Sequence, residues 1–282
     1  MEFAKMHGLG NDYVVVDGFR ETLAEENLPD IARRLCDRHF GIGADGLILV
    51  LPSRVAHVRM RILNSDGSEA EMCGNGIRCF GKFVHDRGIS RENPLEVETI
   101  AGIKTLSMNV ADGVVASSRV DMGEPRLRRS EIPMLPRGSG DSERVVGEPV
   151  RVGSRSFVAT CVSMGNPHCV IFVDNAETFP VEKFGPAIEN HRLFPRRTNV
   201  EFVQVLNSKE IRMGVWERGA GITLACGTGA CASVVACVLN DLTGRKATVH
   251  LLGGDLFIEW MGNNHVMMTG PAAEVFMGRV DV

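Results

Sequence analysis

Apolar residues in the first half of the chain occur in short runs of the length of β-strands. Within residues 58–63, Val58, Met60 and Ile62 alternate with two arginines, as expected of a strand with one buried face. Other β-type runs lie at residues 3–6, 13–16, 47–51, 95–99, 105–110 and 114–120. The first half is therefore predicted to consist mostly of strands.

Two segments of this half have the periodicity of helices instead. Residues 29–39 form an amphipathic pattern that begins at Pro29 and is closed by Gly41. Residues 74–86 are apolar on more than one side, at Ile77, Cys79, Phe80, Phe83 and Val84. Because such a helix must be covered by other elements, residues 74–86 are predicted to form a central helix.

The second half of the chain repeats this order. Strands are predicted at residues 145–152, 157–162, 169–173, 200–206 and 211–216, with a surface helix at 181–189. Residues 228–239 are almost wholly apolar, so this helix is predicted to be buried on all sides. The last strand, at residues 275–282, lies beyond the second repeat, and we expect it to return and complete the first domain.

Short polar motifs recur at nearly the same offset. Cys73-Gly74-Asn75-Gly76 and Cys226-Gly227-Thr228-Gly229 lie 153 residues apart, and Asn11 and Asn166, each after a glycine, lie 155 apart. Asn64 and Glu217 each stand nine residues before one of these cysteines. Landmarks that repeat at one offset indicate a duplicated unit.

The duplication predicts two domains of similar size. We expect an N-terminal domain at residues 1–126, completed by residues 271–282, and a C-terminal domain at residues 127–270. The segment at residues 123–140 holds three prolines, a basic cluster and few periodic apolar residues, which is typical of a crossing between domains. The length of 282 residues is consistent with two domains.

Composition and charge narrow the class of protein. An apolar fraction of 44%, a charged fraction of 23% and a net charge of −4 are ordinary for a globular protein and give no basic surface for nucleic acid. The apolar runs are too short to span a membrane, and the first residues lack the pattern of a signal peptide. We therefore expect a cytoplasmic protein whose eight cysteines stay reduced.

Both cysteine motifs stand directly before a predicted buried helix. The start of a helix leaves backbone N–H groups unpaired and carries partial positive charge, so it can bind a carboxylate and lower the pKa of a thiol. Two such ends facing each other suit chemistry in which a proton leaves one side of a carbon and returns on the other. The alternative is a glycine-rich helix start with an inert cysteine, which the matched pair makes less favourable.

Further polar residues stand at the predicted ends of strands. Asn11, Asn64, Asn166 and Asn199 are in register with the repeat and could line a polar substrate pocket, although a single asparagine is usually a turn residue. Glu217 and Arg218 could bind an ammonium and a carboxylate, or could form a solvated ion pair. His168 is a candidate for assisting proton transfer, with a structural role as the alternative.

Other motifs do not support a cofactor. Residues 41–46 match G-x-G-x-x-G, but a β-type run follows them and no helix begins there, so the context of a dinucleotide site is missing. The cysteine spacings are unlike those of zinc sites. No lysine is marked for pyridoxal phosphate. The simplest interpretation is a reaction without cofactor or metal.

Seven segments together resemble diaminopimelate epimerase. They are residues 7–12, 64–68, 72–79, 165–168, 198–200, 216–219 and 225–229, and the match runs nearly from end to end. The resemblance implies an α+β fold of two pseudo-symmetric domains, each a mainly antiparallel, barrel-like sheet wrapped round a central helix, with the site between them. It also implies interconversion of LL- and meso-2,6-diaminopimelate, on the bacterial route to lysine and peptidoglycan, without pyridoxal phosphate or metal.

The resemblance also implies a role for each candidate residue. Cys73 and Cys226 correspond to the two acid/base residues, and His168 and Glu217 to supporting residues beside them. The implied substrate contacts are Asn11, Asn64, Gly74, Asn75, Asn166, Asn199, Glu217, Arg218, Gly227 and Thr228. Some relatives carry glutamine where this chain has Gly46, so one pocket contact is expected to be missing or replaced by backbone.

Two alternatives remain open. A proline or hydroxyproline racemase-like epimerase shares the architecture and the paired cysteines, but such relatives tend to have histidine where this chain has Asn75 and Thr228. In a redox-sensing protein, Cys73 and Cys226 would instead form a switchable disulfide. The sequence does not fix the oligomeric state, and a homodimer is kept as an expectation.

Overall fold

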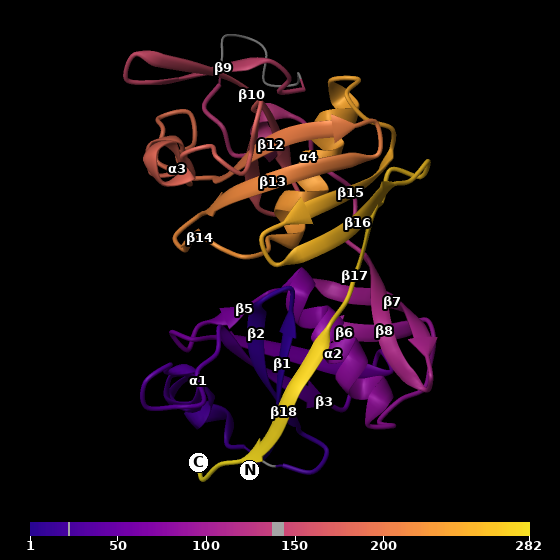
Figure 1. The fold of residues 1–282 in the computed structure, drawn as a ribbon. Helices are drawn as coiled ribbons and strands as arrows, with labels where there is room; N and C mark the ends of the chain where they lie inside the picture. Colours follow the sequence, from indigo (N-terminus) through magenta and orange to yellow (C-terminus); the bar gives the residue numbers. More distant parts are fainter. Residues whose placement is uncertain (22, 137–143) are drawn as a thin grey trace. The chain divides into compact units, whose positions relative to one another are not determined.

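The computed structural model describes residues 1–21, 23–136 and 144–282, and within it the chain divides into two compact units (Figure 1). The first unit comprises Met1–Asp121 and Thr269–Val282, and the second comprises Met122–Met268. The domain boundaries that the sequence predicts, at residues 126 and 270, remain a prediction. Part of the predicted crossing segment, residues 137–140, lies outside the described residues.

The first unit is a sheet around one helix. Its elements are β1 (Glu2–Gly8), β2 (Asn11–Asp17), α1 (Leu28–Cys36), β3 (Gly46–Leu51), β4 (Val58–Asn64), β5 (Glu69–Ala70), α2 (Gly74–Asp86), β6 (Leu95–Thr99), β7 (Gly102–Ala111), β8 (Val114–Asp121) and β18 (Ala273–Arg279). Neighbouring strands follow the order β18–β1–β2–β3–β4–β6–β7–β8, with β5 beside β4. The pairs β2–β3 and β4–β6 are parallel, and the others are antiparallel.

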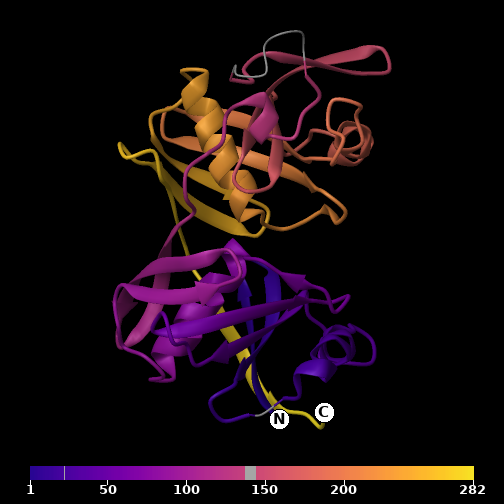
Figure 2. The same ribbon diagram turned by 180° about the vertical axis from the view of Figure 1, so that it is seen from behind.

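Alternation along the strands explains why two helices pack on opposite faces of this sheet. On β2, Val14 and Val16 belong to an apolar cluster with Leu28, Ala32 and Leu35 of α1. The residues between them on β2 face the other side, where α2 contacts β1, β2, β3, β4, β7, β8 and β18 (Figure 2). Because α2 is surrounded by strands, its apolar side chains are buried on all sides, as predicted.

The second unit repeats this plan. Its elements are β9 (Glu148–Val152), β10 (Arg155–Ser163), β11 (Pro167–Phe172), α3 (Val181–Glu189), β12 (Asn199–Asn207), β13 (Glu210–Glu217), β14 (Gly221–Ile222), α4 (Gly227–Leu239), β15 (Lys246–Leu251) and β16 (Gly254–Trp260). Strand β17 (Val266–Gly270) follows and crosses the boundary of the units. The strand order is β9–β10–β11–β12–β13–β15–β16, with β14 beside β13, and β11–β12 and β13–β15 are the parallel pairs.

Helix α4 has the central position in the second unit that α2 has in the first. It contacts β10, β11, β12, β13, β15 and β16, and Ala230, Cys231, Val234 and Val235 have no exposed surface. Small and β-branched side chains let the surrounding strands approach this helix closely. The prediction that residues 228–239 form a helix buried on all sides is therefore confirmed.

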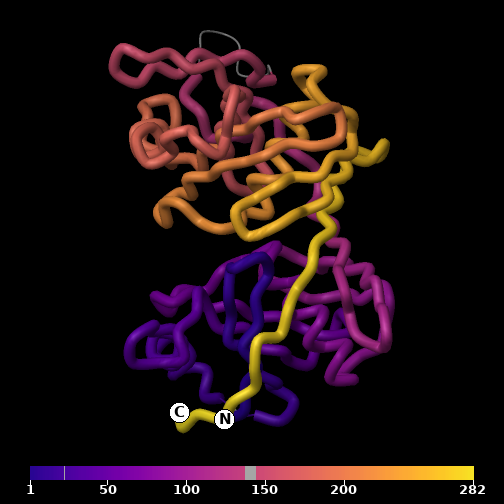
Figure 3. The backbone as a smooth tube through the Cα atoms, in the orientation of Figure 1, coloured from indigo at the N-terminus to yellow at the C-terminus, as the bar shows by residue number. Residues whose placement is uncertain are grey.

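Strands β1 and β10 each pair with one further antiparallel strand. In the second unit, β9 pairs antiparallel with β10, and in the first unit the C-terminal strand β18 pairs antiparallel with β1. The Met1 amino group donates to the Val280 carbonyl at 2.8 Å, so the two chain ends meet in the first unit (Figure 3). The predicted fold class, an α+β protein with two repeated sheet-and-helix units, is confirmed.

The helices of the described residues are short by membrane standards. None of them is both long enough and apolar enough to cross a bilayer.

Candidate active site

The first half-site, defined as Asn11, Tyr13, Cys73 and Asn75, lies at the start of α2. Cys73 is the residue before the helix, with extended backbone angles, and its side chain does not cap the helix. Its sulfur lies 2.9 Å from the Tyr13 hydroxyl and 3.7 Å from Asn11 Oδ1. The Cys73 thiol thus lies beside the beginning of β2, where Asn11 and Tyr13 stand.

Asn11 is held in one orientation by its neighbours. Its Nδ2 donates to Asp45 Oδ2 at 2.6 Å, and Asp45 is paired with Arg38 at 2.8 Å. Its Oδ1 then faces Cys73 and Tyr13, and it accepts from Asn75 Nδ2 at 3.3 Å. Two of the predicted substrate contacts, Asn11 and Asn75, thus lie beside the predicted base Cys73.

Asn64 is separate from this group. It ends β4 opposite Gly46, and its amide donates to Ser68 Oγ at 2.9 Å. Among the described residues it makes no hydrogen bond to the first half-site. Its exposed side chain remains a predicted substrate contact.

The second half-site, defined as Cys226, Thr228, Asn166, His168, Glu201 and Glu217, lies at the start of α4. Cys226 again precedes the helix with extended backbone angles, but its sulfur accepts from the Gly229 N–H at 3.3 Å. The Thr228 hydroxyl is 3.6 Å from the same sulfur. Cys226 is 4% exposed, so this thiol is more enclosed than the partly exposed Cys73.

The electrostatics of Cys226 oppose the effect expected from the helix start. Burial raises the pKa of Cys226 well above its ordinary value, and the negative charges of Glu217 and Glu201 raise it further. Hydrogen bonds from Thr228 and Gly229 act in the opposite direction but are smaller. The prediction that the helix start lowers the thiol pKa is therefore wrong for Cys226, because burial and two carboxylates outweigh one helix end.

Glu217 itself has a perturbed carboxyl group. Burial raises the pKa of Glu217, while a hydrogen bond from the Thr223 hydroxyl and the nearby His168 partly oppose the rise. The same carboxyl group forms a hydrogen bond with the Cys226 side chain. Glu217 thus lies beside the thiol that it was predicted to support.

His168 is fixed between two oxygen atoms. Its Nδ1 lies 2.6 Å from Glu201 Oε1 and its Nε2 lies 3.0 Å from Asn166 Oδ1. Asn166 Nδ2 then donates to Thr228 Oγ1 at 3.2 Å. These contacts form a continuous chain from Glu201 through His168 and Asn166 to Thr228, which contacts Cys226.

Glu201 was missed by the sequence analysis. It has no exposed surface, although it lies in the apolar strand Val200-Glu201-Phe202-Val203. A lone acidic residue in the middle of a buried strand is the signal that could have found it, because buried charges are normally paired.

Asn199 and Arg218 form a separate contact. Asn199 is buried, its Nδ2 donates to the Pro167 carbonyl at 2.9 Å, and its Oδ1 accepts from the Arg218 N–H at 2.9 Å. Its amide therefore ties β11 to the end of β13. The Arg218 guanidinium donates to the Arg196 carbonyl at 3.2 Å and is exposed.

Backbone N–H groups at the two helix starts could hold an anion. The first backbone bond of α2 runs from the Ile77 N–H to the Cys73 carbonyl at 2.9 Å, and that of α4 from the Ala230 N–H to the Cys226 carbonyl at 2.9 Å. The N–H groups of Gly74 and Asn75, and of Gly227 and Thr228, precede these bonds. Such groups, with the helix dipole, form a binding place for a carboxylate.

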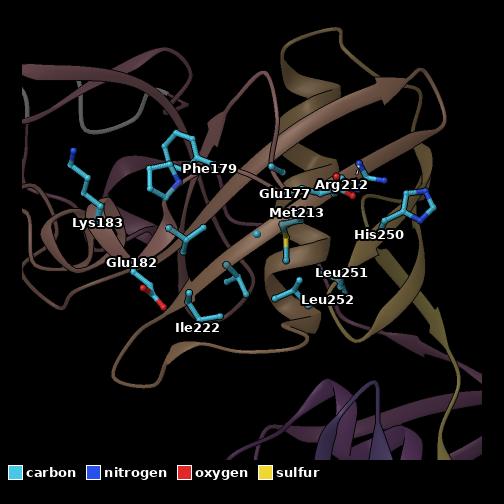
Figure 4. A pocket seen from close by; sticks show the side chains of 15 residues that line it. Glu177, Phe179, Glu182, Lys183, Arg212, Met213, Ile222, His250, Leu251 and Leu252 are labelled. Atoms are coloured by element: carbon cyan, nitrogen blue, oxygen red, sulfur yellow. Dashed lines mark ion pairs between the residues drawn. The ribbon is translucent and has the colours of Figure 1, made fainter.

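A cavity of about 590 Å³ in the second unit lies elsewhere. It is formed by α3, β13 and β15, and Figure 4 shows Phe179, Met213, Leu251 and the ion pair between Arg212 and Glu177 around it. None of the predicted site residues lines this cavity.

Solved structures with low sequence identity share the fold. A PhzF-family phenazine biosynthesis protein from Bacillus anthracis aligns with a TM-score of 0.72 at 17% identity, over 100% of this chain and 99% of that one. A hydroxyproline epimerase from Agrobacterium vitis aligns with a TM-score of 0.71 at 15% identity, over 99% and 90%. The alignments place this chain in a class of proteins that share its fold.

Sequence relatives identify the family within this class. The family model described as diaminopimelate epimerase matches residues 3–128 and 160–275. Diaminopimelate epimerases from Pelotomaculum thermopropionicum and Desulfitobacterium hafniense are 59% and 60% identical, each over 99% of this chain and over 98% and 97% of the relative. The chain belongs to the diaminopimelate epimerase family. The predicted family and the predicted enzyme class, an amino-acid epimerase, are confirmed.

Proposed function

We propose that the protein interconverts LL- and meso-2,6-diaminopimelate with Cys73 and Cys226 as the two acid/base groups. The observation that carries the proposal is that each unit presents a cysteine directly before its central helix, next to N–H groups suited to a carboxylate. Membership of the family supports the choice of substrate. The product would serve lysine and peptidoglycan precursor synthesis.

The reaction must overcome the very weak acidity of an amino-acid α-proton. Removing that proton places negative charge on the α-carboxylate, and the N–H groups at the starts of α2 and α4 would stabilise this charge. Preorganised donors away from bulk water are effective stabilisers of developing charge. The proposed roles of Gly74, Asn75, Gly227 and Thr228 follow from this need, and no cofactor is part of the proposal.

We propose that Cys226 is the thiol and Cys73 the thiolate in the form of the enzyme that converts one of the two isomers. The raised pKa of Cys226 supports this assignment. The Cys73 thiolate then takes the α-proton, and the Cys226 thiol gives its proton to the opposite face of the same carbon. The enzyme is left with a Cys73 thiol and a Cys226 thiolate, which is the form that catalyses the reverse direction.

The remaining predicted residues support these two groups or bind the rest of the substrate. The contacts from Glu201 through His168 to Asn166 would orient Thr228 beside Cys226. Asn199 would act by fixing the Arg218 N–H, because its own amide is bonded to backbone. Asn64, Glu217 and Arg218 are the proposed contacts to the distal amino-acid end.

The proposal also includes location and assembly. A mechanism with two thiols needs both cysteines reduced, which supports a place in the cytoplasm. Strand β18 exposes three consecutive apolar residues, Val275, Phe276 and Met277, at 58%, 47% and 56%. This exposed run supports a homodimer. Sedimentation of the wild type and of Phe276→Arg tests it, because the charged variant should shift toward the monomer.

The proposed reaction is tested by proton NMR of LL-diaminopimelate with reduced protein and no added cofactor. We expect the meso isomer to appear, and Cys73→Ala and Cys226→Ala to abolish its formation while circular dichroism shows both variants folded. Turnover of proline or hydroxyproline in place of diaminopimelate would support the racemase-like alternative instead. Wild-type turnover by either cysteine variant would contradict the two-base proposal.

A further inference from the structure

The ring of Tyr13 fills space that two glycines leave open. Tyr13 is 4% exposed and lies on the face of β2 that packs against α2. A Cβ atom at Gly46 would lie 3.4 Å from two ring carbons and 2.7 Å from the Leu63 carbonyl, and one at Gly76 would lie 3.4 Å from Tyr13 Cζ. A side chain at position 46 would therefore collide with the Leu63 carbonyl and would contact the Tyr13 ring. The sequence predicts that one pocket contact is missing at Gly46. Tyr13 lies next to this position, and its hydroxyl reaches Cys73.

The Tyr13 hydroxyl lies between the Asn11 amide oxygen and the Cys73 sulfur. Its oxygen is 2.5 Å from Asn11 Oδ1 and 2.9 Å from Cys73 Sγ. Because Asn11 Nδ2 donates to Asp45, Oδ1 is the atom that faces the hydroxyl. The hydroxyl has one hydrogen, so it can donate to Asn11 or to Cys73, but not fully to both.

We propose that Tyr13 positions and stabilises the Cys73 thiolate: its hydroxyl hydrogen bonds Asn11 while Cys73 is a thiol and turns to the sulfur when that thiol loses its proton. In the thiol state, the Cys73 S–H donates to the Tyr13 oxygen. In the thiolate state, Asn75 Nδ2, at 3.3 Å, continues to donate to Asn11 Oδ1. No covalent bond of Tyr13 changes, and the Cys73 proton goes to solvent or to substrate.

The surroundings keep the hydroxyl hydrogen on Tyr13. Burial raises the pKa of Tyr13 well above its ordinary value, and the charge of Cys73 raises it further. The other titratable groups facing it are Cys79 on α2, whose pKa burial raises to about 12, and Asp45, which is paired with Arg38. Tyr13 therefore acts as a hydrogen-bond donor and not as a proton source.

This inference rests on the proposed function for its catalytic meaning, but it can be tested without substrate. In Tyr13→Phe, the pH midpoint of Cys73 alkylation, followed by peptide mass spectrometry, should rise by about one to two pH units, because a hydrogen bond to a charged group is lost. Ser118→Ala is the matched control, since it removes a buried hydroxyl packed on α2 away from Cys73. An unchanged midpoint in Tyr13→Phe would overturn the inference.

A second measurement uses the fact that Tyr13 is the single tyrosine of the chain. Incorporated 3-fluorotyrosine gives one fluorine NMR signal. Its chemical shift should change with pH, with the same midpoint as Cys73 alkylation, and should not change with pH in Cys73→Ala. Fluorine makes the phenol a stronger donor, so the alkylation midpoint of this protein should fall. A fluorine chemical shift that does not change with pH in the otherwise wild-type protein would overturn the inference, even if Tyr13→Phe does not fold.

The two proposals fail in different ways. If the pH midpoint of Cys73 alkylation is the same in Tyr13→Phe as in the wild type, and the wild type converts diaminopimelate normally, the role of Tyr13 is rejected and the proposed function stands. Normal alkylation and fluorine shifts without conversion of diaminopimelate would reject the proposed function and leave the Tyr13–Cys73 contact standing. In active protein, the acid limb of the kcat/KM profile should move with the alkylation midpoint in Tyr13→Phe.

Discussion

At the scale of residues, the two thiols have different surroundings although their motifs are near copies. Cys73 contacts neutral groups, Tyr13 and Asn11, and is partly exposed. Cys226 is buried and faces two carboxylates, Glu217 and Glu201. A symmetric motif thus carries an asymmetric pair, as a reaction needs when one thiol must be charged and the other neutral.

This asymmetry predicts the order of alkylation. With iodoacetamide at pH 8, Cys73 should be modified before Cys226, because Cys226 is enclosed and its pKa is raised. Peptide mass spectrometry over a time course measures the two rates. Faster modification of Cys226 would contradict the described electrostatics.

The buried Glu201 carboxylate should matter to turnover. Glu201→Gln keeps the shape but removes the charge beside His168, so kcat should fall roughly tenfold to a hundredfold. The exposed Glu210 on β13 offers a control, and Glu210→Gln should leave kcat unchanged. A kcat for Glu201→Gln within twofold of the wild type would show that the His168 contact is only structural.

The sequence motifs identified the functional residues that lie inside them, but not the partners of these residues elsewhere in the chain. Cys73 and Cys226 are visible because repeat offsets mark them, and His168 is visible because it is a histidine close to the repeated Asn166. Glu201 and Tyr13 are not, because the contacts that make them relevant join positions 33 and 60 residues apart along the chain. Only the pairing of strands with the central helices brings these residues together.

At the scale of elements, close packing at α3 depends on one glycine. A Cβ atom at Gly185 would lie 2.5 Å from Trp216 Cγ, so α3 rests directly on the Trp216 side chain of β13. Helices and strands were predictable from periodicity, but this contact was not. The two-residue strands β5 and β14 were also missed, since two residues show no period.

Gly185→Ala should therefore destabilise the second unit. Overpacking of this kind costs about 1–3 kcal/mol of the free energy of unfolding. Gly262→Ala is the matched control, because a Cβ atom there meets nothing within 4 Å, and it should change stability by less than about 0.5 kcal/mol. Urea denaturation measures both variants, and equal stabilities would contradict the packing at α3.

The first predicted helix shows the limit of periodicity at helix ends. The pattern predicted a helix to residue 39, but α1 ends at Cys36. Asp37 leaves the helical backbone conformation, and its side chain accepts from the N–H groups of His39 and Phe40, both at 2.7 Å. A local turn competes here with the amphipathic pattern, which periodicity alone does not detect.

At the scale of the whole molecule, buried thiols link stability to alkaline pH. Burial raises the pKa of Cys36, Cys79, Cys226 and Cys237, and a hydrogen bond with Cys161 together with burial raises that of Cys169. Above the ordinary thiol pKa, the unfolded chain loses these protons while the folded protein keeps them, so folding becomes less favourable as pH rises. The molecule is accordingly expected to lose stability from about pH 9 upward.

The loss of stability at alkaline pH can be assigned to single cysteines. The free energy of unfolding should fall more gently in Cys237→Ala, by about 1.4 kcal/mol per pH unit less than in the wild type, between pH 9 and pH 11. Cys237 lies in α4 outside the second half-site, and its pKa is raised to about 12. Urea denaturation at several pH values gives the slopes, and identical slopes would contradict the linkage.

Duplication was the feature of the whole chain that the sequence revealed most fully. The repeat offsets predicted two units with one central helix each, and the return of the last strand to the first unit followed from its place beyond the second repeat. The strand register was not predictable, because each parallel pair joins strands separated by a helix or a loop. Register depends on packing against α1 to α4, which no local pattern encodes.

The most direct test of the two-base account is isotope incorporation from deuterium oxide at early times. LL-diaminopimelate is incubated with reduced protein, and proton NMR with mass spectrometry follows deuterium at the α-carbon of substrate and product separately. Since one thiol removes the proton and the other delivers a solvent-derived deuteron, newly formed meso product should carry deuterium while remaining LL-substrate keeps its proton. Deuterium appearing equally in both isomers from the start would contradict two separate bases.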